Sequence, residues 1–237
     1  MGKGDNIAEI IFSSATRAAI VFQDYDIVVI SHTIVSRAEG RLVDLRTINP
    51  SAEALEIAEK TGKDARHVEV ILRESKRILR VERGVIISES RHGIISANAG
   101  VDASNAGGVD YVITLPEDPD ISAARIRQDL KRLTGKELAV IICDTSGRPF
   151  RRGTVNIAIG CSGINPLWDR RGEKDLFGRT LTSKITCVAD EIASAAELVI
   201  GQADEGTPVA LVRGYLFKPG EVPARAIIRP DEENLFK

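Results

Sequence analysis

The sequence is poor in aromatic residues and in cysteine. Aromatic residues make up 4% of the 237 positions, with Trp168 as the single tryptophan, which argues against a surface that stacks nucleic-acid bases. The three cysteines are widely spaced and form no CxxC pair, which argues against a disulfide framework or a zinc site. No apolar run approaches the roughly 20 residues of a membrane helix, and no signal peptide is evident at the N-terminus. We therefore expect a cytoplasmic protein without a membrane partner.

Several familiar chemical signatures are also missing. The net charge is -2, so a general nucleic-acid partner is not expected. Neither GxxxxGK[ST] nor GxGxxG occurs, which excludes a phosphate site of the Walker or Rossmann kind. No Ser-His-Asp set and no evident glycosidase pair of carboxylates was found.

The apolar pattern predicts an α+β fold. Hydrophobic residues make up 43% of the chain, and strand-like segments cluster after residue 80, where hairpin signals join some of them. We expect a mixed or antiparallel sheet core with flanking helices. The expected helices cover 5–19, 49–62, 64–79, 120–135 and 189–200, and the expected strands cover 27–30, 85–88, 94–97, 111–115, a segment from Val140, 154–159, 183–188 and 208–212. Residues 164–179 are expected to be irregular.

The most informative segment is Val140–Gly153. An apolar run, typical of a buried strand, ends in Asp144 and Thr145, and three arginines follow. Asp and Thr oxygens suit Mg²⁺ or Mn²⁺, and guanidinium groups suit phosphate or carboxylate. The pattern indicates chemistry on a metal-bound phosphate, with Arg148, Arg151 or Arg152 as the clamp. Asp-Thr-Ser-Gly is equally good turn chemistry, and an arginine cluster can be a solvated face, so both interpretations stay open.

Three further segments carry polar side chains. Asn98–Asn105 follows a strand, and Asp102 could share a cation with Asp144. Ser31–Gly40 offers hydroxyls and an arginine to phosphate or ribose, and Gly201–Pro208 offers acids after a helix. Each segment also has a purely structural alternative. Asn98–Asn105 can be a polar loop whose side chains hydrogen-bond to their own turn, and Ser31–Gly40 can be an ordinary strand-to-helix connection. Gly201–Pro208 can be a helix C-cap.

Taken together, five segments resemble the coenzyme F420-0:L-glutamate ligase family, also called F420 gamma-glutamyl ligases. They are Ser36–Gly40, Asn98–Asn105, Asp144–Gly153, Cys187–Ala193 and Val212–Gly214, and their order and spacing match along nearly the whole chain. The tail from Arg229 to Phe236 looks like the bacterial branch of the family. We expect one ligase domain over residues 1–237, with room for two intertwined α+β subdomains and without a nitroreductase-like domain.

The resemblance implies an activity. Family members are GTP-dependent ligases that join L-glutamate to the deazaflavin precursor F420-0 by an amide bond, through an acyl phosphate, and then add γ-linked glutamates. GDP and phosphate are released. Mn²⁺ or Mg²⁺ and K⁺ assist, GTP is the co-substrate, and the family forms an intertwined homodimer.

The resemblance also assigns residues by position. The expected metal ligands are Asp102, Asp144, Thr145 and Gln202. The expected nucleotide contacts are His32, Thr33, Arg37, Asn105, Gly201, Gln202, Ala203, Asp204, Glu205, Gly206, Thr207 and Pro208. Arg148 and Arg151 are our candidates for catalysis, from their chemistry rather than from the family.

Three departures from the family pattern stand out. Arg37 replaces a frequent lysine, and Gln202 replaces a glutamate that binds metal in archaeal members, which puts the second metal in doubt. Family members usually begin with a strand and a Leu-Pro loop near the nucleotide, and Met1 comes after most of that segment, so nucleotide binding is expected to suffer. Two alternatives remain: a ligase of this fold that uses another carboxylate acceptor, and a nucleotide-binding module without catalysis. The number of glutamates added and GTP preference over ATP are not encoded in any motif.

Overall fold

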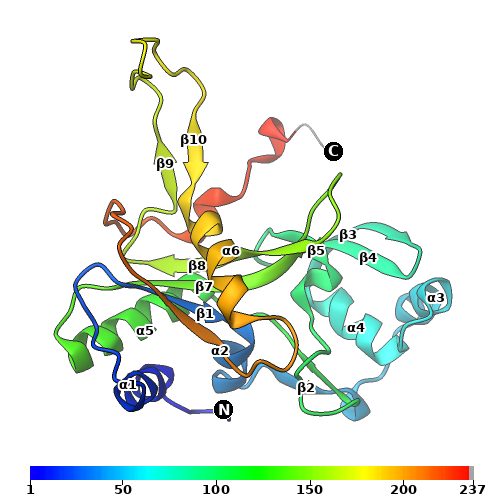
Figure 1. Ribbon diagram of the computed structural model, residues 1–237. Helices are drawn as coiled ribbons and strands as arrows, with labels where there is room; N and C mark the ends of the chain where they lie inside the picture. The colour runs from blue at the N-terminus through cyan, green and yellow to red at the C-terminus, as the bar shows by residue number, and fades with distance from the viewer. Residues whose placement is uncertain (235–237) are drawn as a thin grey trace. The chain divides into compact units, whose positions relative to one another are not determined.

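The computed structural model describes residues 1–234, which form two compact units, each discontinuous in sequence. Unit 1 contains residues 1–7, 31–119 and 144–155, and unit 2 contains residues 8–30, 120–143 and the described residues from 156 onward. Figure 1 shows the helices, in chain order α1 (Ile7–Arg17), α2 (His32–Ala38), α3 (Ala52–Thr61), α4 (Ala65–Glu74), α5 (Pro119–Thr134) and α6 (Val188–Ile200). The strands are β1 (Ile27–Ser31), β2 (Leu42–Asp44), β3 (Ser75–Glu82), β4 (Val85–Ser90), β5 (Ile95–Ala97), β6 (Tyr111–Ile113), β7 (Ala139–Gly147), β8 (Thr154–Ser162), β9 (Leu167–Asp169), β10 (Ile185–Cys187) and β11 (Val209–Val212).

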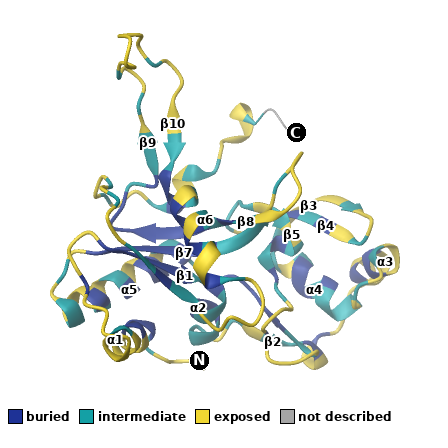
Figure 2. Ribbon diagram, in the orientation of Figure 1, coloured by how far each residue is buried: buried dark blue, intermediate teal, exposed yellow. Residues whose placement is uncertain are grey.

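Unit 2 is built on a four-stranded sheet with the order β11-β1-β7-β8. Ala139, Ile141 and Cys143 of β7 pack in one core cluster with Ala193 and other small residues of α6. They lie on the same face of the sheet because side chains two residues apart in a strand point the same way. Val140 and Ile142, on the opposite face, are also fully buried. Burial on both faces explains why these strands are continuous apolar runs in the sequence, and Figure 2 shows the sheet as the most buried part of unit 2.

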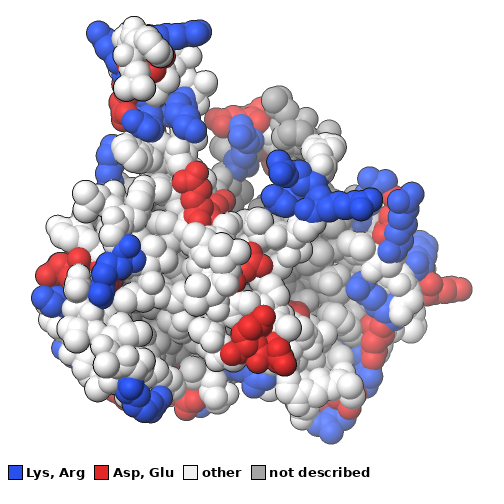
Figure 3. All heavy atoms as spheres, in the orientation of Figure 1, with Lys and Arg blue, Asp and Glu red and all other residues white. Residues whose placement is uncertain are grey.

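An arm projects from unit 2. It consists of residues 167–187, in which β9 and β10 pair antiparallel, with Trp168 opposite Thr186 (Figure 1). Lys and Arg side chains gather on it (Figure 3), and its tip exposes Leu176 and Phe177 almost completely, at 99% and 96%.

Unit 1 combines small antiparallel sheets with the helices α2, α3 and α4. β2 pairs with β6, and β3, β4 and β5 form a separate sheet in that order. Val68 and Ile71 of α4 pack with Ile86 of β4 in the core of this unit. Helices together with mixed and antiparallel sheets confirm the predicted α+β class. Among the described residues, no helix combines the length and apolar character needed to cross a membrane.

The helix predicted over 64–79 is wrong in its second half. Asp64 caps α4 as expected, but the helix ends at Glu74 and Ser75–Glu82 form β3. Leu79, the last residue of the expected helix, is 43% exposed on β3. Arg83 and Gly84 both have positive φ, as in a tight hairpin turn, and the resulting pairing with β4 overrides the helical spacing.

Three smaller expectations are corrected. The helix expected from residue 49 begins later, and Ser51 caps α3 through its hydroxyl, which accepts from the backbone N–H of Ala54. The helix expected from residue 120 begins at Pro119, and the carboxylate of Asp120 accepts from the backbone N–H groups of Cys161 and Ala224 rather than capping α5. Part of the segment expected to be irregular forms β9. Asp120 does not act as a cap because its carboxylate binds partners 41 and 104 residues away in the sequence.

Candidate functional site

The strands β1 and β7 position the first two site residues, His32 and Asp144, which both belong to unit 1. β1 ends at Ser31, and α2 begins at once with His32. β7 continues past its apolar half, so Asp144 and Thr145 lie within the strand rather than in a turn after it. His32 Nε2 lies 3.3 Å from Asp144 Oδ1, and the imidazole is 3% exposed. The turn interpretation of Asp144 is therefore wrong, because the strand holds this acid in extended backbone.

The second ring nitrogen of His32 also has a partner. Nδ1 lies 3.4 Å from the hydroxyl of Ser36, one helical turn further along α2, and Ser36 is fully buried. Burial disfavours the charged imidazolium, but the charges of Asp144 and Asp102 outweigh it and raise the pKa of His32 above its usual value. His32 is thus buried between a hydroxyl and an acidic group. A nucleotide contact at this position would have to use its backbone.

Asp102 is held by a strained turn. Asn98, Ala99 and Gly100 have φ values of 56°, 54° and 73°, a left-handed run that costs about 1–2 kcal/mol for a residue such as alanine. A Cβ at Gly100 would lie 2.9 Å from the Leu115 side chain, so only glycine fits there. The backbone of Asp102 then exchanges two hydrogen bonds with Ile113, at 2.9 and 2.7 Å. Strain of this kind persists where the surrounding structure fixes one geometry, which is common at functional sites.

The carboxylate of Asp102 has its own local support. One oxygen accepts from the backbone N–H of Ser104 at 2.7 Å, and the other accepts from the Ser104 hydroxyl at 2.8 Å. Asp144 Oδ1 accepts from the backbone N–H of Thr145 at 2.7 Å. Both acids therefore have fixed orientations, and both act electrostatically on His32.

The donor set suits a hard divalent cation that also binds substrate. Within residues 1–234 no group of three or more His, Cys, Asp or Glu side chains is arranged to hold a metal ion. Mg²⁺ typically takes one or two carboxylates together with substrate phosphate oxygens, and not an all-protein cage. Asp102, Asp144 and the Thr145 hydroxyl fit that pattern.

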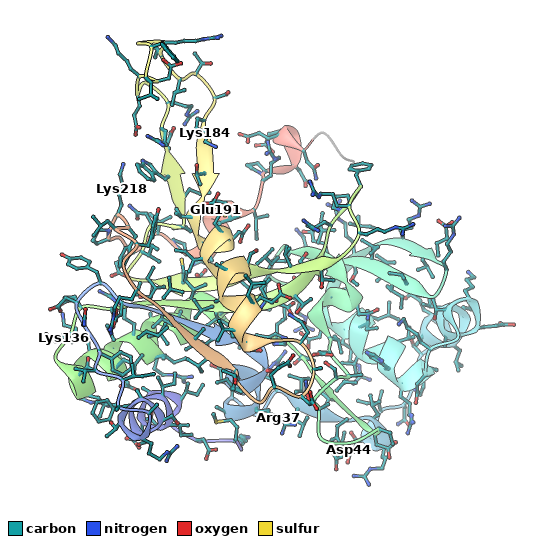
Figure 4. All side chains as sticks on the ribbon, viewed as in Figure 1. Arg37, Asp44, Lys136, Lys184, Glu191 and Lys218 are labelled. Atoms are coloured by element: carbon teal, nitrogen blue, oxygen red, sulfur yellow. The ribbon has the colours of Figure 1, made fainter. Side chains whose placement is uncertain are left out.

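The predicted nucleotide residues of unit 1 are partly brought together. Arg37, at the last turn of α2 (Figure 4), donates from Nη2 to the backbone oxygen of Asn105 at 2.7 Å. Asn105 itself has a φ of 50°, a left-handed conformation that asparagine tolerates. The Thr33 hydroxyl lies 2.9 Å from the Ser31 hydroxyl. Arg37 and Asn105, which the resemblance assigns to the nucleotide, are 68 residues apart in sequence and are in direct contact in the structure.

The three arginines of the β7–β8 loop have different environments. Arg148 donates from Nη2 to the backbone oxygen of Arg152 at 2.9 Å and from Nε to that of Gly153 at 3.4 Å. Arg151 and Arg152 are exposed. Phe150 is 90% exposed and has a φ of 65°, which is rare for an aromatic residue. Arg148 therefore braces the loop, and Arg151 is the better placed of the two catalytic candidates to meet a ligand.

Residues 201–208 belong to unit 2 and follow the C-terminus of α6. Gly201 caps the helix, and the Glu205 carboxylate folds back to accept from the backbone N–H of Ala203 at 2.8 Å, which holds the pKa of Glu205 below its usual value. The negative end of a helix and two acids favour a cation or hydrogen-bond donors over a phosphate group. Asp204, Gly206, Thr207 and Pro208 lie in the same loop.

Gln202 is part of an internal hydrogen-bond network. Its Nε2 donates to Glu197 Oε1 at 2.6 Å and to Asn156 Oδ1 at 3.1 Å. Glu197 Oε2 also accepts from the backbone N–H of Asn156. The amide nitrogen of Gln202 is thereby fixed within unit 2, which leaves only its carbonyl oxygen suited to a metal ion.

Sequence reasoning missed the residues that support the acids and Gln202. Ser36 lies four residues after His32, the spacing that places two side chains on one helix face. Ser104 lies two residues after Asp102, the spacing of an Asx turn. Both signals were available locally. Glu197 and Asn156, which hold Gln202, are 41 residues apart, and no local pattern links them.

The fold and the site together define an α+β protein with two oriented acids and an arginine-anchored loop in one unit. Residues 1–214 match the profile of the family described as F420-0:Gamma-glutamyl ligase, and the chain belongs to this family. It is 51% identical to the coenzyme F420:L-glutamate ligase of Methanothermobacter thermautotrophicus over 242 aligned residues, which cover 100% of this chain and 94% of that relative.

Two other relatives carry the same description. The protein of Methanopyrus kandleri is 52% identical over 240 residues, with coverage of 99% of this chain and 92% of the relative. The protein of Methanocaldococcus jannaschii is 48% identical over 236 residues, with coverage of 100% and 92%. The predicted family is confirmed. The assignment to the bacterial branch stays a prediction, and residues 235–237 of the tail lie outside the described part of the chain.

Proposed function

We propose that this protein is a GTP-dependent ligase that joins L-glutamate to coenzyme F420-0. The observation that carries the proposal is the pair of oriented carboxylates, Asp102 and Asp144, which both act on buried His32 in a member of this ligase family. Carboxylates in fixed orientations are the ligands that a divalent cation takes together with substrate phosphate oxygens. The arrangement supports catalysis better than a nucleotide-binding module without activity.

In the proposed reaction, the terminal carboxylate of the acceptor attacks the γ-phosphorus of GTP. The bond to the β,γ-bridging oxygen breaks, which yields GDP and an acyl phosphate. The α-amine of glutamate then attacks the acyl carbon, loses a proton and displaces phosphate, which forms the amide. Repeated additions would use the γ-carboxylate of the last glutamate.

Each group of side chains has a proposed part in this sequence. Asp102, Asp144 and Thr145 would hold Mn²⁺ or Mg²⁺. The metal would neutralise charge on the phosphate oxygens during transfer. Arg37 and Asn105 would orient the nucleotide. The roles of Gln202, of residues 201–208 and of K⁺ follow from the resemblance alone. Arg151 would bind a phosphate or carboxylate group, on a loop braced by Arg148.

We also propose that the protein forms a homodimer. The arm, residues 167–187, exposes Leu176 and Phe177 at its tip, and large apolar side chains exposed together mark interaction sites. Lys184 on the arm and Glu191 on α6 add charged groups near its base (Figure 4).

The direct test is a product assay. The protein is incubated with GTP, Mn²⁺, glutamate and F420-0, and the products are analysed by mass spectrometry. We expect F420-0 to gain glutamate with release of GDP, and EDTA to stop the reaction. If product forms only with a different carboxylate acceptor, the protein is a ligase of this fold with another substrate. If the protein binds GDP but forms no product, it is a nucleotide-binding module without catalysis.

Asp144→Asn is the matched variant. Loss of one negative charge from the pair should reduce metal-dependent turnover at least 100-fold while the thermal melting curve stays within a few degrees. Asp129→Asn, at a half-buried acid on α5 that pairs with Arg132, serves as the control. Full activity of Asp144→Asn would remove Asp144 from the metal site.

A further inference from the structure

We propose that His32 is a positioning residue for Asp144, rather than a nucleotide contact through its side chain. The inference rests on the proposed function, because Asp144 matters here as a metal ligand. Its basis is that the two ring nitrogens of His32 have different partners: Nδ1 lies 3.4 Å from the Ser36 hydroxyl, and Nε2 lies 3.3 Å from Asp144 Oδ1.

The first step of the argument is burial. His32 is 2% exposed and Ser36 is fully buried. Neither side chain can reach a nucleotide without leaving the interior, and both ring nitrogens already have partners. The hydroxyl of Ser36 is inaccessible, so the Ser-His-Asp order does not make Ser36 a nucleophile.

The second step is the direction of the hydrogen bonds. When the imidazole is neutral, Ser36 donates to Nδ1, which places the ring proton on Nε2, facing Asp144. When the imidazole is protonated, Nε2 still carries a proton toward Asp144. In both forms Nε2 donates to the carboxylate, so the orienting contact does not depend on the protonation state.

The third step is where the carboxylate is held. Asp144 Oδ1 receives both the Thr145 N–H and the His32 contact. With this oxygen fixed from two sides, the plane of the carboxylate is set. Hydrogen-bond partners that orient a ligand typically change metal affinity by about 10- to 100-fold when they are removed.

Metal binding is the readout, measured as the loss of the free Mn²⁺ EPR signal on titration with protein in the absence of nucleotide. His32→Leu should weaken Mn²⁺ binding at least 10-fold. His32→Gln, whose amide nitrogen can replace Nε2 as a donor, should restore binding to within about threefold of wild type. Ser36→Ala should have an intermediate effect.

Nucleotide binding separates the two roles. GDP affinity, measured by calorimetry in EDTA, should stay within twofold of wild type in His32→Gln and Ser36→Ala. Equal losses of GDP and Mn²⁺ affinity, or Mn²⁺ binding by His32→Leu equal to that of wild type, would overturn the proposal. So would a wild-type protein that does not bind Mn²⁺.

A measurement on the wild-type protein avoids any folding defect of the variants. Nitrogen-15 NMR of the imidazole should show a proton on Nε2, and the Nε2 resonance should shift when Mg²⁺ is added. A neutral ring protonated on Nδ1 would contradict the arrangement. If wild type binds Mn²⁺ as expected but forms no glutamylated product, the proposed function fails while the positioning role stands.

Discussion

At the residue scale, the role of a side chain depends on what its polar atoms already contact. The arginines of the β7–β8 loop are alike in sequence, yet Arg148 is bonded to the backbone of its own loop and Arg151 is exposed. Arg213 offers a parallel case, since its guanidinium makes a bidentate contact with buried Asp26, at 2.8 and 2.7 Å. Among the arginines of the family motifs, Arg148 and Arg213 therefore stabilise the structure, whereas exposed Arg151 can bind a ligand.

Arg151→Ala should lower kcat/KM for glutamate ligation without changing stability. Loss of one charge-assisted hydrogen bond to a ligand corresponds to about 1.5–3 kcal/mol, or roughly 10- to 100-fold. Arg148→Ala should lower kcat/KM as well, and it should also speed tryptic cleavage after Arg151 and Arg152, because the loop loses its brace. Steady-state kinetics and limited proteolysis test both statements, with Arg132→Ala on α5 as the control. Wild-type GTP turnover in both variants would show that the loop has no part in the reaction.

At the scale of elements, pairing with a neighbouring strand decides the local structure. β3 is the example: its residues follow a helical apolar pattern, but Glu89 on β4 binds both Lys76 and Arg77 across the pair. The hydrogen bond from Lys76, together with the bonds and charge from Arg77, outweighs the effect of burial and lowers the pKa of Glu89 below its usual value. The β3–β4 sheet is therefore held partly by charge.

Glu89→Gln should lower the melting temperature at pH 7 and have a smaller effect at pH 3. An acid whose pKa is lowered by folding contributes stability that is complete above its unfolded pKa, about 4.3–4.5. That contribution is lost as pH falls through the lowered pKa of the folded state. Thermal melts at both pH values measure the difference, with exposed Glu82→Gln as the control. An equal loss at both pH values would mean that packing, rather than charge, explains the effect.

At the scale of the whole molecule, the chain forms two compact units, and each unit is assembled from several separate segments of the sequence. β7 crosses the boundary between Cys143 and Asp144, so one strand contributes its apolar half to unit 2 and its acid to unit 1. The arm exposes Leu176 and Phe177 at its tip.

Replacing both Leu176 and Phe177 by Ser should weaken self-association. We expect the wild-type protein to elute as a dimer in size-exclusion chromatography with light scattering, and the double variant to shift toward monomer at the same concentration. Leu55→Ser, at a 56% exposed position on α3, is the matched control. A dimer of unchanged stability in the double variant would place the interface elsewhere.

The sequence by itself determined the α+β class, the buried strands and the family, because apolar runs and five spaced motifs carry that information locally. It also identified Asp102, Asp144 and Arg37 as candidates. Only the tertiary structure decided that Asp144 lies within β7, that residues 75–82 form a strand, that Arg148 braces its loop, and that His32 is buried between Ser36 and Asp144. The reason is physical: each of these facts depends on which hydrogen-bond partner or strand neighbour a residue meets, and residue type and spacing do not name that partner.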